Sequence, residues 1–121
     1  MNKQEIGAIG EQAACQFLNN NGYKVLEKNY RCREGEVDIV ALAQDQVVFV
    51  EVRTKTTSGF GTPEESVTCK KMKSLRAVVE HFIQHHRGLP ESYRIDFIGV
   101  RMGRDGRLLR IEHIENAIDG V

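Results

Sequence analysis

The chain has 121 residues, which is enough for one domain with a substantial hydrophobic core but not for two. Its 17 basic and 17 acidic side chains cancel, which excludes a strong overall positive field of the kind that attracts nucleic acid to very basic proteins. Any charged partner must therefore be inferred from local patterns. We expect a single domain over residues 1–121.

The cysteines and the N-terminal stretch give expectations about the cellular compartment. Cys15, Cys32 and Cys69 are widely spaced and form no Cys-x-x-Cys pair, so we expect free thiols in a reducing cytoplasm instead of disulfides or zinc ligands. The chain begins with MNKQEIGAIG, which lacks the apolar core of a signal peptide, and no apolar run approaches membrane-spanning length. The sequence therefore predicts a soluble, cytoplasmic protein without a membrane partner.

The first predicted element is a helix between Asn2 and Gly22. Asn2 and Glu5 have the spacing of a helix cap with its reciprocal glutamate, and Gly22 is typical of a helix end. One apolar face follows at helical spacing: Ile6, Gly10, Ala13, Ala14, Phe17 and Leu18. A glycine within a helix costs about 1 kcal/mol relative to alanine, so we expect Gly7 and Gly10 to allow close approach of another backbone.

Glu11 lies at the edge of this apolar face. Its side chain could lean over the edge of the sheet, or it could be an ordinary exposed helix glutamate; the helical spacing alone leaves both interpretations open.

A first strand is predicted over Tyr23–Arg31, followed by a basic loop with Arg31 and Arg33. The next stretch, Gly35–Lys55, contains two runs rich in Val, Ile and Phe around a short polar turn, which predicts a β-hairpin. Each run carries one carboxylate where an apolar residue is expected, Asp38 in the first and Glu51 in the second.

The hairpin register decides whether these two acids meet. A turn centred between Gln44 and Asp45 places Asp38 opposite Glu51, whereas a turn shifted by half a pair does not. Opposed Cβ atoms lie roughly 5 Å apart, and two like charges at about that distance repel by ~3 kcal/mol at an effective dielectric near 20. The pair would need a positive charge, either Mg²⁺ or Mn²⁺, or the side chains of Arg53 and Lys55 on the same strand face.

A second helix is predicted to begin at Thr68, after a loop over Thr57–Pro63 and a turn over Pro63–Val67, although a start at Thr62 also fits the pattern. The loop lies next to the carboxylates and is a natural place for substrate contact. Cations crowd the start of the helix, where they oppose its dipole: Lys70, Lys71, Lys73 and Arg76. They could bind phosphates or simply form a solvated charged face.

The last part of the chain predicts a hairpin of two strands. His81 and His85 are one helical turn apart and could chelate zinc, but no third ligand is spaced to help them. Strands are expected over 93–101 and 107–113, joined by a turn at 103–106. Asp96 interrupts the first of these strands, and it is either a third member of the acidic cluster or the partner of Arg94 or another nearby cation.

The predicted order is helix, three strands, helix, two strands, which resembles that of restriction-endonuclease-like nucleases. Their signature is an acid on one strand and Glu-x-Lys on the next. Eight pieces of the sequence together resemble the bacterial YraN family, which is similar to archaeal Holliday-junction resolvases: Gly10-Glu11, Gly22-Tyr23, Asn29-Tyr30-Arg31, Gly35-Glu36-Val37-Asp38, Phe49-Val50-Glu51-Val52-Arg53, Phe60-Gly61, Lys70 and Arg94-x-Asp96. The resemblance implies an α/β fold with a restriction-endonuclease-like core, a mixed five-stranded sheet flanked by helices in the order α-β-β-β-α-β-β.

The resemblance also implies roles for single residues. Asp38 and Glu51 would hold Mg²⁺ or Mn²⁺ with help from the Val52 carbonyl, and Glu11 would complete the acidic site. Phosphodiester bonds of DNA, including branched or junction DNA, would be hydrolysed, as in DNA repair or recombination. A homodimer is expected by the same analogy. Nucleic acid would be bound by a basic set: Arg31, Arg33, Lys70, Lys71 and Lys73.

One position departs from the nuclease signature. Arg53 occupies the place of the usual lysine, and arginine can bind phosphate or stabilise a transition state but cannot act as a base. Lys55, or Lys70 from the helix, would have to replace the missing amine. If neither does, the chain would be a nucleic-acid-binding module without catalysis, and a third alternative is a protein-interaction domain with purely structural acids.

Overall fold

The computed structural model describes residues 2–56 and 69–117, with the side chains of Cys69 and Lys70 outside the description. The described elements are α1 (Lys3–Asn20), β1 (Lys24–Cys32), β2 (Gly35–Ala43), β3 (Gln46–Thr56), α2 (Cys69–His85), β4 (Ser92–Met102) and β5 (Leu108–Ile114). This order, and the single mixed sheet that the strands form, confirm the predicted α/β fold class. The expected loop at 57–63 and turn at 63–67 lie outside the described residues.

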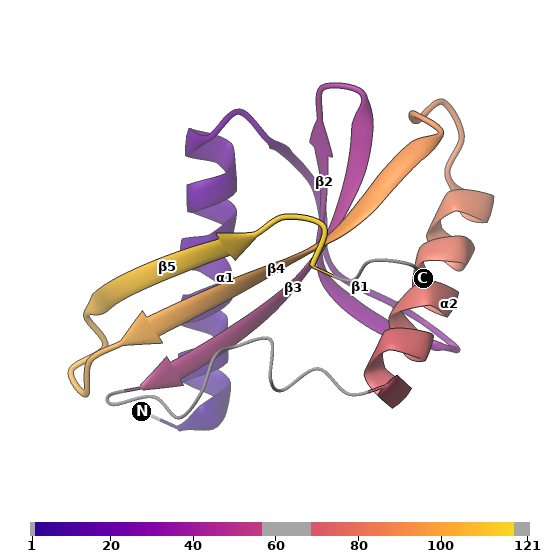
Figure 1. Ribbon diagram of the computed structural model, residues 1–121. Coiled ribbons are helices and arrows are strands. Elements are labelled where there is room, and N and C mark those ends of the chain that lie inside the picture. The colour runs from indigo at the N-terminus through magenta and orange to yellow at the C-terminus, as the bar shows by residue number, and fades with distance from the viewer. Residues whose placement is uncertain (1, 57–68, 118–121) are drawn as a thin grey trace.

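The five strands lie in the order β1-β2-β3-β4-β5. Neighbouring strands are antiparallel except β3 and β4, which run parallel and are separated in the chain by α2. The helices lie on opposite sides of the twisted sheet (Figure 1). Each face of the sheet is therefore covered by one helix.

Helix α1 begins as the sequence predicts. The Glu5 N–H donates to Asn2 Oδ1 at 2.8 Å, and the Asn2 N–H donates to Glu5 Oε1 at 3.3 Å, which completes the reciprocal cap. At the other end the chain leaves the helix through Gly22, whose φ of 87° lies in the left-handed region that favours glycine.

The two helix glycines differ in their surroundings. A Cβ added at Gly10 would lie 1.8 Å from Thr54 Oγ1 of β3, so this glycine lets α1 pack closely on the sheet, against a side chain and not a backbone. A Cβ at Gly7 would meet no described atom within 4 Å. The expected approach of another backbone is therefore wrong for both glycines among the described atoms, and at Gly10 a side chain makes the close approach instead.

This difference gives a matched pair of substitutions. Gly10→Ala is expected to lower the free energy of unfolding by about 1–2 kcal/mol, because the overpacking penalty exceeds the gain in helix propensity. Gly7→Ala is expected to raise it by up to about 1 kcal/mol. Urea denaturation of both variants measures the difference, and equal stability of the two would contradict the close contact with Thr54.

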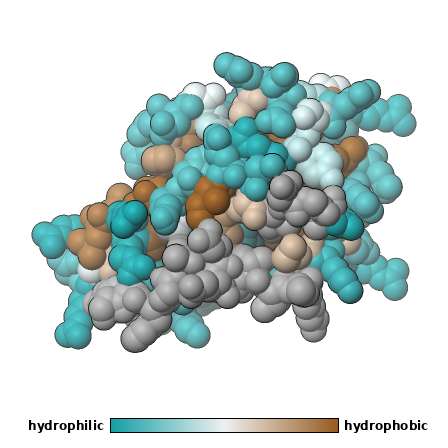
Figure 2. All heavy atoms as spheres, viewed as in Figure 1, coloured by the Kyte–Doolittle hydropathy of each residue, from teal (hydrophilic) through white to brown (hydrophobic). Residues whose placement is uncertain are grey.

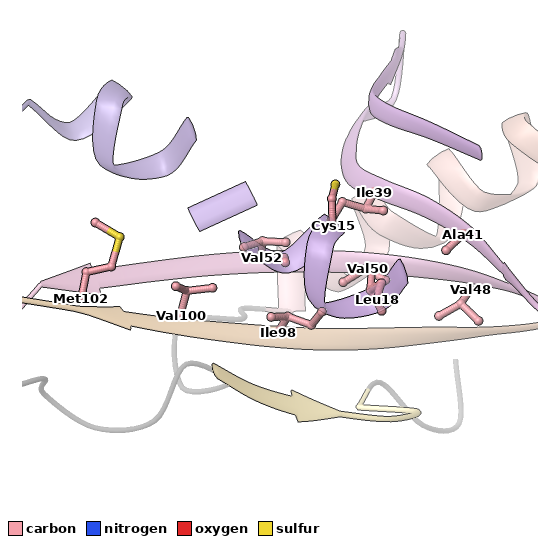
Figure 3. Close-up of a cluster of buried hydrophobic side chains, with 11 residues drawn as sticks. Cys15, Leu18, Ile39, Ala41, Val48, Val50, Val52, Ile98, Val100 and Met102 are labelled. Atoms are coloured by element: carbon pink, nitrogen blue, oxygen red, sulfur yellow. The ribbon is translucent and has the colours of Figure 1, made fainter. Parts of the chain in front are cut away.

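Two apolar clusters hold the layers together. Between α1 and the sheet lie Ala14, Cys15, Leu18, Ile39, Ala41, Val48, Val50, Val52, Ile98, Val100 and Met102. Figure 3 draws this cluster, with Cys15 and Leu18 of α1 against side chains of the strands. Between the sheet and α2 lie Tyr30, Val37, Val40, Val47, Phe49, Leu75, Val78, Val79, Phe82 and Ile95. The sheet is thus buried on both faces, which explains the nearly continuous apolar runs in its central strands.

The edge strand β5 is more exposed. Leu108 and Leu109 are 49% and 51% exposed, and Figure 2 shows apolar colour gathered where β5 lies, on a face that is otherwise largely hydrophilic. No described helix is both long enough and apolar enough to cross a membrane.

Candidate functional site

The β2–β3 ladder brings Asp38 to the point where the two strands separate. The pairing runs from Ala43 and Gln46 through Val40 and Phe49 to Ile39 and Val50, as expected for a turn centred between Gln44 and Asp45. Asp38 comes next, but the regular pairing ends before it. Its Oδ2 instead accepts the Val52 N–H at 2.7 Å. A side-chain carboxylate thus replaces a main-chain acceptor and is fixed beside β3.

Glu51 is the second acid of the site, and its side chain is only 2% exposed. Its Oε2 lies 3.0 Å from Lys71 Nζ of α2 and 3.3 Å from Arg53 Nη2 two residues along β3. One of the proposed internal cations, Arg53, is therefore present, together with a lysine from the opposite helix. The side chain of Arg53 is 34% exposed and that of Lys71 is 26% exposed, so both cations are partly solvated.

These cations do not compensate for the burial of Glu51. Desolvation, the charge of Asp38 and a side-chain hydrogen bond with Asp38 raise the pKa of Glu51 from 4.5 to about 7, against the lowering effect of Lys71. Glu51 therefore holds its proton at a higher pH than an ordinary glutamate does, because it is buried and lies beside the negative charge of Asp38.

The buried oxygen of Glu51 fits a metal. Oε2 accepts no hydrogen bond of good geometry from any described residue, although two cations lie within ion-pair distance of it. The partners of this oxygen are therefore the ion-pair contacts with Arg53 and Lys71, two partly exposed cations. Carboxylate oxygens are the ligands that Mg²⁺ and Mn²⁺ prefer, so the donor set of Asp38 and Glu51 suits these ions.

Glu11 of α1 belongs to the same electrostatic cluster. Partial burial and the charge of Asp38 raise the pKa of Glu11, whereas a side-chain hydrogen bond with Asn29 lowers it. Of the two interpretations of Glu11, the structure favours the one in which it leans over the sheet. Asn29 is a residue that the sequence analysis did not assign to the site. Its φ of 53° in the middle of β1 is a signal of a special role, but it is visible only in the coordinates.

The other residues expected around the metal lie along β3. Val52 contacts Asp38 through its amide N–H, and a ligand role for its carbonyl stays a prediction. Lys55 is half-buried and lies two residues beyond Arg53 on the same strand face. The side chain of Lys70, the alternative source of an amine, lies outside the described residues.

The residues expected to bind nucleic acid, as far as their side chains are described, lie at the end of β1 and on α2. Arg31 Nε pairs with Glu36 Oε2 at 2.9 Å on the surface, and Arg33 and Lys73 are exposed. Lys71 contacts Glu51, an acidic partner that was not expected from the sequence, and its role in binding nucleic acid stays a prediction. A contact across α2 and β3 has no signature in the sequence, because it depends on how the helix packs.

Asp96 is not part of the carboxylate cluster. It is fully buried and accepts hydrogen bonds from Arg94 Nε at 2.9 Å and from the Asn116 N–H at 2.9 Å, and it lies 2.8 Å from His113 Nε2. Burial raises the pKa of Asp96, but these partners outweigh it, and the net effect is a lowered pKa. Of the two predicted roles, pairing with Arg94 is confirmed, and we describe Asp96 as a structural acid.

Comparison with solved structures gives a distant likeness. Pyrococcus furiosus SfsA, solved in complex with Ca²⁺, is 12% identical; the match covers 88% of this chain and 59% of that one, at a TM-score of 0.31. This likeness is too low to carry an argument.

Several curated relatives match over almost their whole length. UPF0102 proteins of Caldicellulosiruptor saccharolyticus and Alkaliphilus oremlandii are each 42% identical over 97% of this chain and 99% of their own. That of Dehalococcoides mccartyi is 42% identical over 97% of this chain and 95% of its own. The model of the "Uncharacterised protein family UPF0102" matches residues 10–100, which include all three acids of the cluster. The chain therefore belongs to UPF0102, the YraN family.

Proposed function

We propose that the protein is a metal-dependent endonuclease that hydrolyses phosphodiester bonds in DNA. The observation that carries this proposal is the buried Glu51 carboxyl, whose pKa is raised to about 7 beside Asp38 although Lys71 and Arg53 lie within ion-pair distance of its Oε2. A structural ion pair would be expected to lower the pKa of its acid, as Arg94 and His113 do for Asp96. The Asp38–Glu51 pair therefore behaves as a site prepared for a further cation.

Asp38 and Glu51 would hold Mg²⁺ or Mn²⁺, with the Val52 carbonyl as a third oxygen. When bound, such an ion lowers the pKa of its water and stabilises negative charge on a phosphate. The Val52 N–H fixes the Asp38 carboxylate at 2.7 Å, so this acid is held in place before any ion arrives.

The remaining charged groups would act on the DNA. Arg53 can bind a phosphate oxygen or stabilise charge that develops on it, because a guanidinium is a planar, multiple hydrogen-bond donor. Lys71 lies beside Glu51 and is suited to the same task from the α2 side. Glu11 extends the acidic surface toward α1, and Lys55 would supply the amine that the nuclease signature has two residues earlier.

DNA is proposed as the substrate because exposed cations lie after β1 and on α2, the helix that also supplies Lys71 to Glu51. Arg33 follows β1, and Lys73 and Arg76 lie on α2, all of them exposed. Such residues provide sequence-independent contacts with phosphates. Branched or junction DNA is the substrate structure that the family resemblance favours, and a homodimer stays a prediction that size measurement in solution can test.

The second candidate function is a nucleic-acid-binding module without catalysis. The observation that favours it is the guanidinium of Arg53, which lies 3.3 Å from Glu51 Oε2, where a metal would have to compete with it. This alternative expects salt-sensitive binding of branched DNA and no product with any metal.

A cleavage assay separates the two candidates. The protein is incubated with labelled four-way-junction, flap and duplex DNA, with Mg²⁺, with Mn²⁺, or with a chelator. If the protein is an endonuclease, we expect it to nick the DNA only when Mg²⁺ or Mn²⁺ is present. Binding that is sensitive to salt, with intact DNA under every metal condition, would overturn the endonuclease proposal in favour of the binding module.

A further inference from the structure

A second group of metal-ligating side chains lies away from the carboxylate cluster. Cys32 ends β1, Glu34 lies in the turn before β2, and His81 lies near the end of α2. One ligand atom from each of the three lies within 4.8 Å of the other two. The sequence analysis expected Cys32 to be an unligated thiol and offered only His81 and His85 as a zinc pair, because residues 32 and 81 are far apart in the chain.

We propose that Cys32, Glu34 and His81 form a binding site for Zn²⁺. Donor atoms on one tetrahedral zinc ion lie within roughly 4 Å of one another, so small side-chain movements would complete the site. A thiolate and an imidazole select zinc over Mg²⁺, which prefers oxygen ligands alone. Three protein ligands leave a fourth position for water. The half-buried Cys32 and His81 and the exposed Glu34 leave a path for the ion to enter.

The surroundings of His81 support this assignment. The Tyr30 hydroxyl lies 2.6 Å from His81 Nδ1, and Tyr30 is itself 9% exposed, so it holds the ring in one orientation. With Nδ1 engaged by Tyr30, Nε2 is the nitrogen left for a metal. A ligating histidine commonly has its other ring nitrogen hydrogen-bonded in this way. Zinc on Nε2 would require the proton on Nδ1, which would then donate to the Tyr30 oxygen.

His85 is not part of the site. Its ring stacks on that of His81 with 4.1 Å between centroids, and its Nδ1 lies 2.8 Å from the His81 carbonyl oxygen. The candidate ligand set therefore comes from β1, the turn before β2, and α2, and not from the one-turn spacing of His81 and His85. This set would tie the β1–β2 turn to α2, next to the hydrogen bond that Ser74 Oγ already donates to the Glu34 carbonyl at 2.9 Å.

Metal titration of the full chain, kept reduced, tests the proposal. Zn²⁺ affinity is measured by competition with a chromogenic chelator, and Co²⁺ is used as a spectroscopic substitute. We expect one Zn²⁺ per chain, a raised melting temperature, and a sulfur-to-cobalt charge-transfer band. Cys32→Ser and His81→Ala are each expected to lower the Zn²⁺ affinity at least about 100-fold, and Tyr30→Phe about 10–100-fold, as for other outer-shell partners.

Two controls make the result specific. Cys15→Ala removes a buried thiol on the other side of the sheet, and Asp38→Asn disables the carboxylate site; both are expected to keep the Zn²⁺ affinity and the cobalt band. Unchanged affinity in Cys32→Ser, or a Co²⁺ complex of the wild-type protein without the charge-transfer band, would overturn the zinc site. Loss of binding in Asp38→Asn would do the same, because it would assign the ion to the carboxylates.

Discussion

Asp38→Asn is expected to reduce metal-dependent cleavage of DNA by more than about 100-fold while the protein stays folded. Loss of an outer-shell partner alone costs 10–100-fold at metal sites, and this substitution removes a charged ligand. The asparagine oxygen can still accept the Val52 N–H, which is the contact that Asp38 makes in the fold. The measurement is the initial rate of nicking of junction DNA with Mg²⁺ and with Mn²⁺.

The control for this variant is Asp45→Asn. Asp45 is an exposed acid in the turn of the same hairpin, so its loss changes the net charge equally without touching the cluster. Cleavage at the wild-type rate is expected for Asp45→Asn. Undiminished cleavage by folded Asp38→Asn would show that the activity arises at a different site.

Asp96→Ala is expected to have the largest effect on stability. It would leave the Arg94 guanidinium, whose side chain is only 17% exposed, without its buried partner. It would also remove the hydrogen-bond acceptor of the Asn116 N–H and the carboxylate that contacts His113. Removing one partner of a buried ion pair costs about 3–5 kcal/mol, which lowers the melting temperature of a domain of this size by roughly 10–20 °C. Urea and thermal denaturation at neutral pH measure the loss.

Glu115→Ala is the matched control for Asp96→Ala. Glu115 also pairs with Arg94, at 3.2 Å, but its side chain is 61% exposed, so its loss is expected to cost less than about 1 kcal/mol. Because the folded pKa of Asp96 is lowered, its contribution is present above the unfolded pKa of 3.8 and is lost as the pH falls through the folded value. Similar stability of the two variants would contradict the structural role of Asp96.

The fold was largely predictable because its signals are local. The cap formed by Asn2 and Glu5, the left-handed Gly22 and the polar turn at Gln44 and Asp45 each act within a few residues. The two packed faces follow from strand alternation and helical spacing, which also depend only on near neighbours. The mixed character of the sheet came instead from the family resemblance, whereas the order of the strands in the sheet and the parallel β3–β4 pair were not predicted.

For the carboxylate site, the sequence predicts only the register of the β2–β3 hairpin that carries Asp38 and Glu51. Counting from the turn of the hairpin places Asp38 next to Glu51, but not the main-chain bond from Val52 that holds Asp38. Lys71 beside Glu51, Asn29 beside Glu11, and Cys32 beside His81 join elements far apart in the chain. Such contacts depend on how the helices lie on the sheet, and a single sequence carries no signal for them.

The raised pKa of Glu51 has a consequence for stability, and its direction can be stated. Between the unfolded value of 4.5 and the folded value of about 7, the folded state binds more protons than the unfolded state, so stability falls as the pH rises through this range. Above pH 7 the ionised carboxylate destabilises the metal-free protein by on the order of 3 kcal/mol. A bound divalent cation would remove this penalty, and its binding would release a proton.

The most direct test of a cation site at Asp38 and Glu51 is the melting temperature of wild-type protein and Glu51→Gln at pH 8, with and without Mn²⁺. Without metal, Glu51→Gln is expected to melt higher than the wild type by roughly 5–10 °C, and this difference is expected to vanish near pH 5. With Mn²⁺, the melting temperature of the wild type is expected to rise and that of Glu51→Gln to stay unchanged. A wild-type melting temperature that does not respond to Mn²⁺, or an equal rise in Glu51→Gln, would contradict a metal site at these two acids.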